Sequence, residues 1–456
     1  MSSLIGLLNL GATALRAQNA GIAVTANNVA NASTPGYSRQ RISLESQLGT
    51  PLVGGVLAGG IDRMSSSLLA GRMRSNTGSL SVAEAFSSAL LDLEASMTVP
   101  GNDVGALVAG FFSQVSQVSA SPGEQGLRDA AVQAARSLAA GLQRQSAEVA
   151  EARNDANQRI RESVQEANRL ITQIAAANKA TVLTNDPIVR DQRDQAAQRL
   201  SELVGGTARI DPDGQMRVTL PGGESLVDGQ RGAQLVATPD AALANMDRIQ
   251  VVDGNHVRDV TAGIDGGRIG GDLRMRDQVA PAALAQLDQL AFDISTQLNG
   301  VHQQNAGLDG QTGRNLFAPP TQVAGAAAAM AVDPAVSADP SLLATAAAGA
   351  GPGDNRGALA MLGLRDQPLA DGGRRTFADA GIQITADVGR QAADAAVDRD
   401  FFAAQGNYLT GLRDSISGVS VQEEMTNLSQ FQHAAEAQMQ FLSTVDELLG
   451  SIIQGL

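Results

Sequence analysis

Cysteine and tryptophan are absent from this sequence of 456 residues, and histidine occurs only as His256, His302 and His433. Without cysteine the chain has no disulfides, thiolate metal sites or cysteine nucleophiles. The three histidines fall in separate predicted segments, and none has a second ligand at metal spacing. We therefore expect a structural or solvated role for each histidine. We also expect a non-enzymatic protein with no catalytic residues, metal site or cofactor.

Positive charge comes almost entirely from arginine, since Lys179 is the single lysine, and the formal net charge is −14. An acidic chain without a Lys/Arg run repels phosphate backbones and acidic membrane surfaces, so it is not expected to bind nucleic acid or membranes. No stretch approaches the ~18 consecutive apolar residues of a membrane span. The apolar residues 4–8 precede the first basic residue, Arg16, which is the reverse of a cleaved secretion signal.

Aromatic residues make up only 3% of the chain. Cores must then be filled by Ala, Leu, Val and Ile, which favours long, closely packed helices. The strongest helix pattern covers residues 121–178 and opens with the capping box Ser121-Pro122-Gly123-Glu124. Such a helix would be about 80 Å long. Asp186-Pro187 predicts the start of a further helix, which Gly205-Gly206 ends.

Residues 207–271 have a different pattern, in which short strand-like stretches alternate with Asp-Gly and Gly-Gly turn dipeptides. We predict a small β-rich domain inserted into a helical body. The glycine run at 263–271 lacks the G-K-[ST] of a phosphate loop and predicts a flexible hinge. Helices are expected again at 272–304 with a kink at Pro281, at 355–365, and at 376–415 before a break at Gly418. The Ala-rich residues 321–352 have the composition of a loose connector.

Both ends of the chain carry apolar residues at alternating spacings of four and three. One interpretation is two amphipathic helices within one compact domain. The other is that each helix packs on its partner and on copies from adjacent subunits, and orders only on assembly because such helices are marginal alone. The residues predicted for this polymer interface are Leu4, Leu8, Leu15, Ile22, Val29, Val421, Met425, Leu428, Phe431, Met439, Leu442 and Leu449.

The most specific motif, residues 26–39, follows the N-terminal helix pattern. Asn27, Asn28 and Asn31 stand where that helix is expected to end and can cap and cross-link it, while Pro35-Gly36 forces a turn before Tyr37. Together with the apolar chain start and the C-terminal heptads, this motif resembles the N-terminal signature of the axial flagellar proteins. That family comprises the rod, hook and hook-associated subunits.

Three further segments resemble the hook-associated members of this family: residues 185–194, residues 331–355 and residues 417–432. The second of them makes the Ala-rich connector a patterned segment. The matches run from one end of the chain to the other. One departure is that residues 318–352 leave no room for the extra outer β domain that some relatives carry.

The resemblance implies a mainly α fold with terminal coiled-coil helices, a long-helix bundle body and nested, discontinuous domains. Residues 1–60 and 416–456 would form the inner tube layer. Residues 61–206 and 272–415 would form the bundle body, and residues 207–271 would be the inserted outer β domain.

The resemblance also implies a structural subunit of the bacterial flagellum, extracellular at the hook–filament junction after a transient stay in the cytoplasm. Export would use the flagellar type III system. The implied partners are other copies in the junction ring, the hook protein, the second junction protein (hook-associated protein 3), and an export chaperone on the C-terminal helix. The alternatives are another axial subunit such as a hook or distal-rod protein, an enzyme site within residues 207–271, and a cytosolic coiled-coil scaffold.

Overall fold

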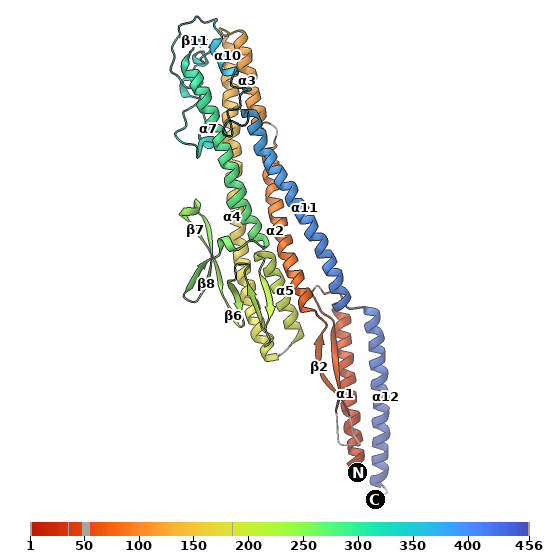
Figure 1. Ribbon diagram of the computed structural model, residues 1–456. Coiled ribbons are helices and arrows are strands. Elements are labelled where there is room, and N and C mark those ends of the chain that lie inside the picture. The colour runs from red at the N-terminus through yellow and green to blue at the C-terminus, as the bar shows by residue number, and fades with distance from the viewer. Residues whose placement is uncertain are drawn as a thin grey trace.

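The computed structural model describes residues 2–454 apart from residues 35, 48–54, 100, 102 and 185. The molecule is a long helical rod whose two chain ends lie together at one tip, with small antiparallel sheets beside its middle (Figure 1). This confirms the predicted fold class, which is mainly α with long terminal helices and a small β insertion.

The terminal part of the rod is an antiparallel helix pair, α1 (Ser2–Ala30) and α12 (Val421–Gln454), lying side by side (Figure 1). Two glycines let the helices approach closely. A Cβ on Gly11 would lie 2.6 Å from Leu442 Cδ2, and a Cβ on Gly21 would lie 2.7 Å from the ring of Phe431. Large side chains of α12 therefore fill the space that the glycines leave on α1.

A β-hairpin that the sequence did not predict follows α1. Its strands β1 (Gln40–Gln47) and β2 (Gly55–Arg63) pair antiparallel and pack against α1. Ile42 is the buried contact, with 8% exposure. The period-two signal is weak because β1 alternates only two apolar residues and β2 contains three glycines.

The body is a bundle of long helices around α4 (Gln125–Thr184), whose 60 residues extend about 90 Å. Small side chains such as Ala131 and Ala135 are fully buried where the helices meet. Thr376 caps α11 (Phe377–Ser417) and Gly418 ends it, which confirms the predicted break before the terminal helix. The other helices of the bundle are α2 (Ser67–Met97), α3 (Val104–Ala120), α10 (Arg356–Leu362) and α11 (Phe377–Ser417).

The predicted limits of the longest helix are wrong at both ends. Ser121 is the C-cap of α3, and Pro122 and Gly123 form the turn that leads into α4. A helix directly precedes this stretch, so its polar and helix-breaking residues end one helix before the next begins. At the other end α4 continues past Asn178, because the Asn178 side chain donates to the carbonyls of Met216 at 2.8 Å and Gly229 at 2.6 Å.

Helix α5 (Pro187–Val204) confirms its predicted limits. Asp186 Oδ1 accepts from the Ile188 N–H at 2.9 Å, and Gly205 (φ +68°) ends the helix in the left-handed conformation. Two small antiparallel sheets follow and confirm the predicted β-rich segment; they share a core with α4 and α5. One sheet holds β3 (Thr207–Ile210), β4 (Met216–Thr219), β5 (Ser225–Asp228) and β6 (Arg231–Gly232). The other holds β7 (Gln234–Asp240), β8 (Met246–Asp253) and β9 (His256–Asp259).

The prediction of a flexible hinge at residues 263–271 is wrong. Helix α6 (Gly267–Arg274) begins there and packs against α2 and α5. A Cβ on Gly271 would lie 2.7 Å from the carbonyl oxygen of Val82, so glycine permits a close helix contact rather than mobility. A π-helical turn, Met275–Val279, leads into α7 (Ala280–Gln304), so the irregularity expected at Pro281 lies just before it.

The Ala-rich segment forms short elements packed at the far tip of the rod. Fully buried Arg128 of α4 holds this segment by donating to the carbonyls of Leu343 at 2.7 Å and Ser341 at 3.1 Å and to the Thr345 hydroxyl at 2.5 Å. Burial lowers the pKa of Arg128 to about 10. The short elements are α8 (Ala326–Ala329), α9 (Pro334–Ala338) and β11 (Ala346–Ala347), which pairs with β10 (Asn305–Ala306) from outside the segment.

Candidate functional site

The motif residues at the end of α1 form a hydrogen-bonded cluster centred on Asn28, which is 1% exposed. The Asn28 amide nitrogen donates to the Gln40 carbonyl at 2.8 Å and to Glu424 Oε2 at 2.9 Å. Its amide oxygen accepts from the Tyr37 hydroxyl at 2.8 Å and from the Gln40 N–H at 2.9 Å. All four hydrogen-bonding positions of the amide are therefore used. One side chain joins α1 to β1 and to the start of α12.

The other asparagines shape the end of α1, as predicted. The Asn31 side chain donates to the Asn27 carbonyl at 3.0 Å and to Asn27 Oδ1 at 2.8 Å. Burial and the nearby carboxylates of Asp191 and Glu424 raise the pKa of Tyr37 to about 12. The phenol therefore stays protonated over the physiological range and can donate to Asn28.

The turn predicted at Pro35-Gly36 is present, because the Tyr37 N–H donates to the Thr34 carbonyl at 3.2 Å. Gly36 has φ +77°, and a Cβ there would lie 2.4 Å from Gln195 Nε2 of α5. The backbone conformation therefore favours glycine, and a larger residue here would also displace the Gln195 side chain. Pro35 itself lies outside the described residues.

Arg39 forms a second link between the loop after α1 and the start of α12. Its guanidinium donates to Glu424 Oε1 at 2.8 Å and to Glu423 Oε1 at 2.7 Å. The backbone N–H of Arg39 donates to the Ser417 carbonyl at 3.0 Å. Glu424 is only 2% exposed, so this pair is partly desolvated. Glu423 and Glu424 at the start of α12 thus hold the loop of the N-terminal motif.

Helix α5 closes the cluster from the side of the body. Arg63 at the end of β2 forms ion pairs with Asp191, at 3.1 Å, and with Asp194. The Ser38 N–H donates to Asp191 Oδ2 at 3.4 Å. Burial raises the pKa of Asp191, and Arg63 opposes that shift. We refer to Asn27, Asn28, Asn31, Tyr37, Arg39, Arg63, Asp191, Asp194, Glu423 and Glu424 together as the terminal-body cluster.

The sequence identified the asparagine and tyrosine half of this cluster and missed the charged half. Arg39, Asp191 and Asp194 stand inside the segments that resemble the family, so those segments carried a usable signal. Arg63 follows a hairpin that was not predicted, and nothing in the sequence marks it.

The residues predicted for the polymer interface fall into two groups in the single chain. On α12, Val421, Met425 and Met439 are 47%, 52% and 52% exposed. Gly11, Gly21 and Asn28 of α1 meet α12, and Ala17, Val24 and Thr25 of α1 are also buried. One chain therefore covers only part of its terminal apolar surface. The half-buried members of the predicted set are Leu4, Leu8, Leu15, Ile22, Val29, Leu428, Phe431, Leu442 and Leu449.

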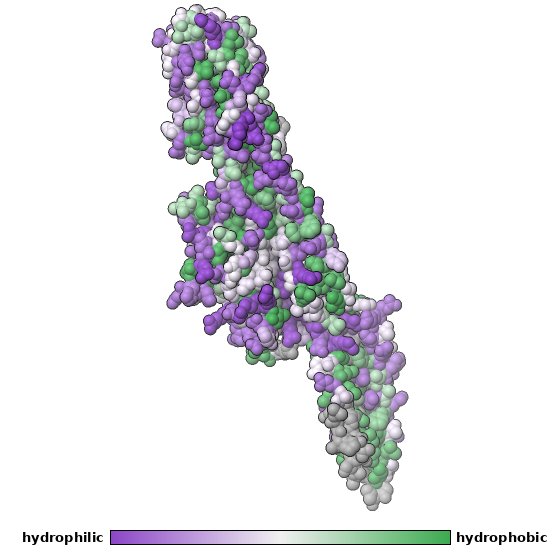
Figure 2. Space-filling model, viewed as in Figure 1, coloured by the Kyte–Doolittle hydropathy of each residue, from purple (hydrophilic) through white to green (hydrophobic). Residues whose placement is uncertain are grey.

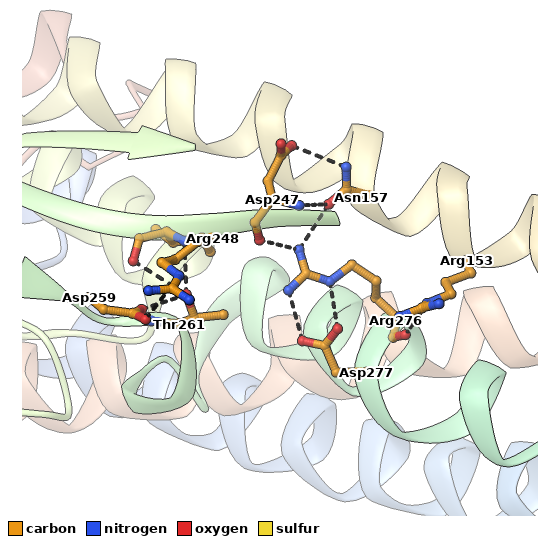
Figure 3. A network of polar contacts seen from close by, with 9 residues as sticks. Arg153, Asn157, Asp247, Arg248, Asp259, Thr261, Arg276 and Asp277 are labelled. Carbon is orange, nitrogen blue, oxygen red and sulfur yellow. Dashed lines mark hydrogen bonds and ion pairs between the residues drawn. The ribbon is translucent and has the colours of Figure 1, made fainter. Parts of the chain in front are cut away.

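A second polar network fixes the small sheets to the body (Figure 3). Arg276, fully buried in the π-helical turn, donates to Asn157 Oδ1 at 2.8 Å, to the Asp247 carbonyl at 2.7 Å and to Asp277 Oδ2 at 2.8 Å. Asn157 of α4 also donates to Asp247 Oδ2 at 3.1 Å. These groups satisfy one another, so the network positions β8 against α4.

The histidine positions agree with structural and solvated roles. Buried His302 has Nδ1 2.8 Å from the Arg314 carbonyl, and its Nε2 accepts from the Ala344 N–H at 3.0 Å. Burial lowers the pKa of His302, so the ring is neutral. Among the residues that the structure describes, no three His, Asp or Glu side chains could share a metal ion. No helix among the described residues is long and apolar enough to cross a membrane.

Different protein-family models match the two ends of the chain and its body. The model described as the flagellar hook-associated protein FlgK helical domain matches residues 90–317, half of the chain. The model for the flagella basal body rod protein matches residues 8–37, which include most of α1 and the asparagine motif. The model for the C-terminal part of the flagellar basal body rod FlgEFG proteins matches residues 413–455.

Similar proteins extend over the full length of the chain. Flagellar hook-associated protein 1 of Bacillus subtilis (strain 168) is 25% identical over 509 residues, covering 100% of this chain and 99% of the relative. Flagellar hook-associated protein 1 of Escherichia coli (strain K12) is 24% identical, covering 99% and 100%. The structure of the flagellar hook junction protein FlgK from Burkholderia pseudomallei has the same fold, with a TM-score of 0.70 at 16% identity over 76% of this chain and 100% of that one.

Proposed function

Because the chain belongs to the family of the flagellar hook-associated protein FlgK, we propose that it is a structural subunit of the junction between hook and filament. The match of the FlgK helical domain to residues 90–317 carries this proposal. A hook or distal-rod subunit would account for the two ends, which match rod-protein models, but not for the body. Membership of the family places the protein in the flagellum as a structural component.

In this proposal α1 and α12 are the elements that polymerise. Exposed Met425 and Met439 become covered by neighbouring subunits, and full burial of such a side chain contributes about 1.5–3 kcal/mol. Ordering the backbone costs about 1–2 kcal/mol per residue. Intersubunit burial is therefore needed to hold the terminal helices, which couples their folding to assembly.

The terminal-body cluster would transmit load between the inner tube and the body. The chain passes between them twice, near Arg63 and near Ser417. The cluster holds both passages and also ties the turn at Ser38 to α5. We accordingly propose a terminal domain of residues 1–60 and 416–456, a bundle body of residues 61–206 and 272–415, and an outer domain of residues 207–271. Such a subunit couples a bending hook to a stiff filament and performs no catalysis.

The partners follow from the same proposal. Other copies complete the junction ring, with hook protein on one side and the second junction protein, hook-associated protein 3, on the other. A chaperone would cover the exposed apolar face of α12 in the cytoplasm, and the flagellar type III system would export the chain without cleavage.

The direct test is deletion of the gene in its own bacterium, followed by electron microscopy of isolated flagella. We expect hooks that lack filaments, and restoration of filaments when the full chain is supplied. Gold-labelled antibody against residues 207–271 should then mark the boundary between hook and filament. Label along the whole hook or in the rod would identify another axial subunit instead, and normal filaments in the deletion strain would refute the proposal.

A further inference from the structure

The outer side of α11 carries a stripe of four large, exposed apolar side chains, which we call the α11 stripe. Its members Val397, Phe401, Tyr408 and Leu412 are 69%, 61%, 72% and 38% exposed. At about 100° of rotation per helical residue, these side chains fall within about 60° of one another. Gly406 lies roughly 150° from the middle of the stripe. It faces α2, because a Cβ there would lie 3.0 Å from Asn76 Nδ2. The stripe therefore points away from the body of its own chain.

The area of the α11 stripe is that of an interface surface. Figure 2 shows hydrophobic residues along the side of the rod that α11 forms. An aromatic side chain buries about 150–250 Å² when covered, so Phe401 and Tyr408 together leave roughly 200–300 Å² uncovered. With the two aliphatic members the stripe reaches roughly 400–500 Å², the size of apolar patch that marks interaction sites. This is about half of the ~800 Å² that each partner buries in a stable interface.

A groove between the start of α2 and strand β3, which we call the α2–β3 groove, has matching chemistry. Its volume is about 820 Å³, and its lining includes Leu68, Arg72 and Ser75 of α2 and Arg209 and Ile210 of β3. Leu68 and Ile210 are 68% and 47% exposed. Neither Arg72 nor Arg209 forms an ion pair within the described residues. Apolar walls with unpaired guanidinium groups suit aromatic side chains, because arginine stacks on aromatic faces.

The groove and the stripe lie at the same level along the rod. The Asn76 side chain of α2 donates to the Phe402 carbonyl of α11 at 3.0 Å and also meets Gly406. The start of α2 and the end of α11 line one pocket, so the two helices run antiparallel. Arg72, one helical turn before Asn76, is therefore level with about residue 408 of α11. Copies that stand side by side at the same height would bring the stripe of one onto the groove of the next.

The stripe and the groove are different surfaces of one molecule. Figure 1 shows α2 between α11 on one side and the small sheets on the other. Arg74 of α2 donates to the Ala208 carbonyl of β3 at 3.1 Å, and the groove opens between this contact and that of Asn76 with α11. A contact between two different surfaces is heterologous, so each copy can repeat it, which generates a ring or a helical tube. The stripe runs along the rod for about 22 Å, so a copy that stands alongside covers it.

We propose that the α11 stripe of one copy packs into the α2–β3 groove of the next copy in the junction ring. The inference rests on the proposed function, which it deepens by naming the surfaces through which the bodies of neighbouring subunits meet. Tyr408 lies against Leu68 and Arg72 of the next copy, and Phe401 extends the contact along the rod. Tyrosine, phenylalanine and arginine are the residues that protein interfaces favour at their centres.

Photo-cross-linking in assembled flagella tests the contact directly. The photoreactive residue p-benzoylphenylalanine replaces Tyr408 in the full-length chain, which is supplied to the deletion strain, and isolated flagella are irradiated. We expect a covalent dimer on denaturing gels, in which mass spectrometry finds the link at residues 67–75 or 205–210 of the second chain. The same photoreactive residue in place of Leu359, which is 50% exposed on α10, is the matched control and should not reach those residues.

Other products overturn the proposal in ways that can be told apart. A link between α11 of one copy and α11 of another would show that the stripe meets itself, and a link to hook protein would give it a different occupant. If the photoreactive chain is present in flagella and supports filaments but forms no link, the proposed surfaces do not pair although the junction role stands. If even the wild-type chain is missing from flagella, the proposed function itself fails.

Substitution provides a second arm that does not depend on photochemistry. Phe401→Ser with Tyr408→Ser removes both aromatic side chains of the stripe. Because these side chains are exposed in the free chain, its melting temperature should not change, while isolated flagella should contain at least tenfold less of the protein. Val257→Ser with Leu359→Ser, at positions that are 58% and 50% exposed, is the matched control and should be incorporated like the wild type. Equal incorporation of the two double variants would overturn the proposal.

Discussion

The sharpest single test of the terminal-body cluster is Asn28→Asp, which changes polarity without changing shape. The substitution replaces the amide nitrogen, which donates at 2.8 Å to the Gln40 carbonyl and at 2.9 Å to Glu424, with an oxygen. The Gln40 carbonyl and the Glu424 carboxylate, both buried acceptors, then face the new carboxylate oxygen, which is a third acceptor. Each buried group left without its partner costs about 1–3 kcal/mol, so the terminal helices lose about 2–6 kcal/mol.

In the proposed assembly, folding of the terminal helices is coupled to binding, so the same loss is subtracted from the free energy of binding to hook ends. We expect Asn28→Asp to bind isolated hooks at least ~30-fold more weakly in co-sedimentation of the full-length chain, since about 1.4 kcal/mol is tenfold. Asn19→Asp, at an exposed position on the same helix, is the control. Equal binding by both variants would refute the role assigned to Asn28.

Three further perturbations test other parts of the account. Arg128→Met should lower the free energy of opening of residues 340–346 by about 2–4 kcal/mol, measured by hydrogen exchange, because several buried acceptors lose their donor; unchanged exchange would contradict this. Burial raises the pKa of Asp272 to about 6, so the contribution of this group to stability is greatest below about pH 4 and falls by about 3 kcal/mol as pH rises through 6. Asp272→Asn should flatten that slope in urea denaturation, and a slope equal to that of the wild type would count against the assignment. Gly21→Leu should weaken binding to hooks because its side chain collides with Phe431, whereas Gly450→Leu, which has open space, should bind normally; equal binding would mean the helices do not pack at Gly21.

Local chemistry explains which elements could be predicted. The limits of α5 follow from Asp186-Pro187 and Gly205, whose effects act within a few residues. The break at Gly418 and the β-rich segment likewise depend on turn and cap residues. The hairpin, the closely packed glycines of α6 and the true start of α4 depend on neighbours distant in sequence, so no short pattern carries them.

The cluster shows the same division. Asn27, Asn28, Asn31 and Tyr37 could be selected because they form one compact motif. Their bond to Glu424 joins residues 396 positions apart, and the pairing of Arg63 with α5 requires a hairpin that has almost no periodic signal. The four-three spacing of apolar residues could predict that α12 carries outward apolar side chains. Which residues stay exposed depends on how the two helices rotate about their glycine contacts.

The central claim is that the terminal helices become covered by neighbouring subunits on assembly. Amide exchange of the purified full-length chain, alone and then bound to isolated hooks, tests it most directly. We predict that residues 2–30 and 421–454 exchange much faster than α4 in the free chain and become protected at least tenfold on hooks, while exchange within α4 hardly changes. Terminal helices already as protected as α4 in a monodisperse free chain, with no change on hooks, would contradict the account and favour a self-contained helical scaffold.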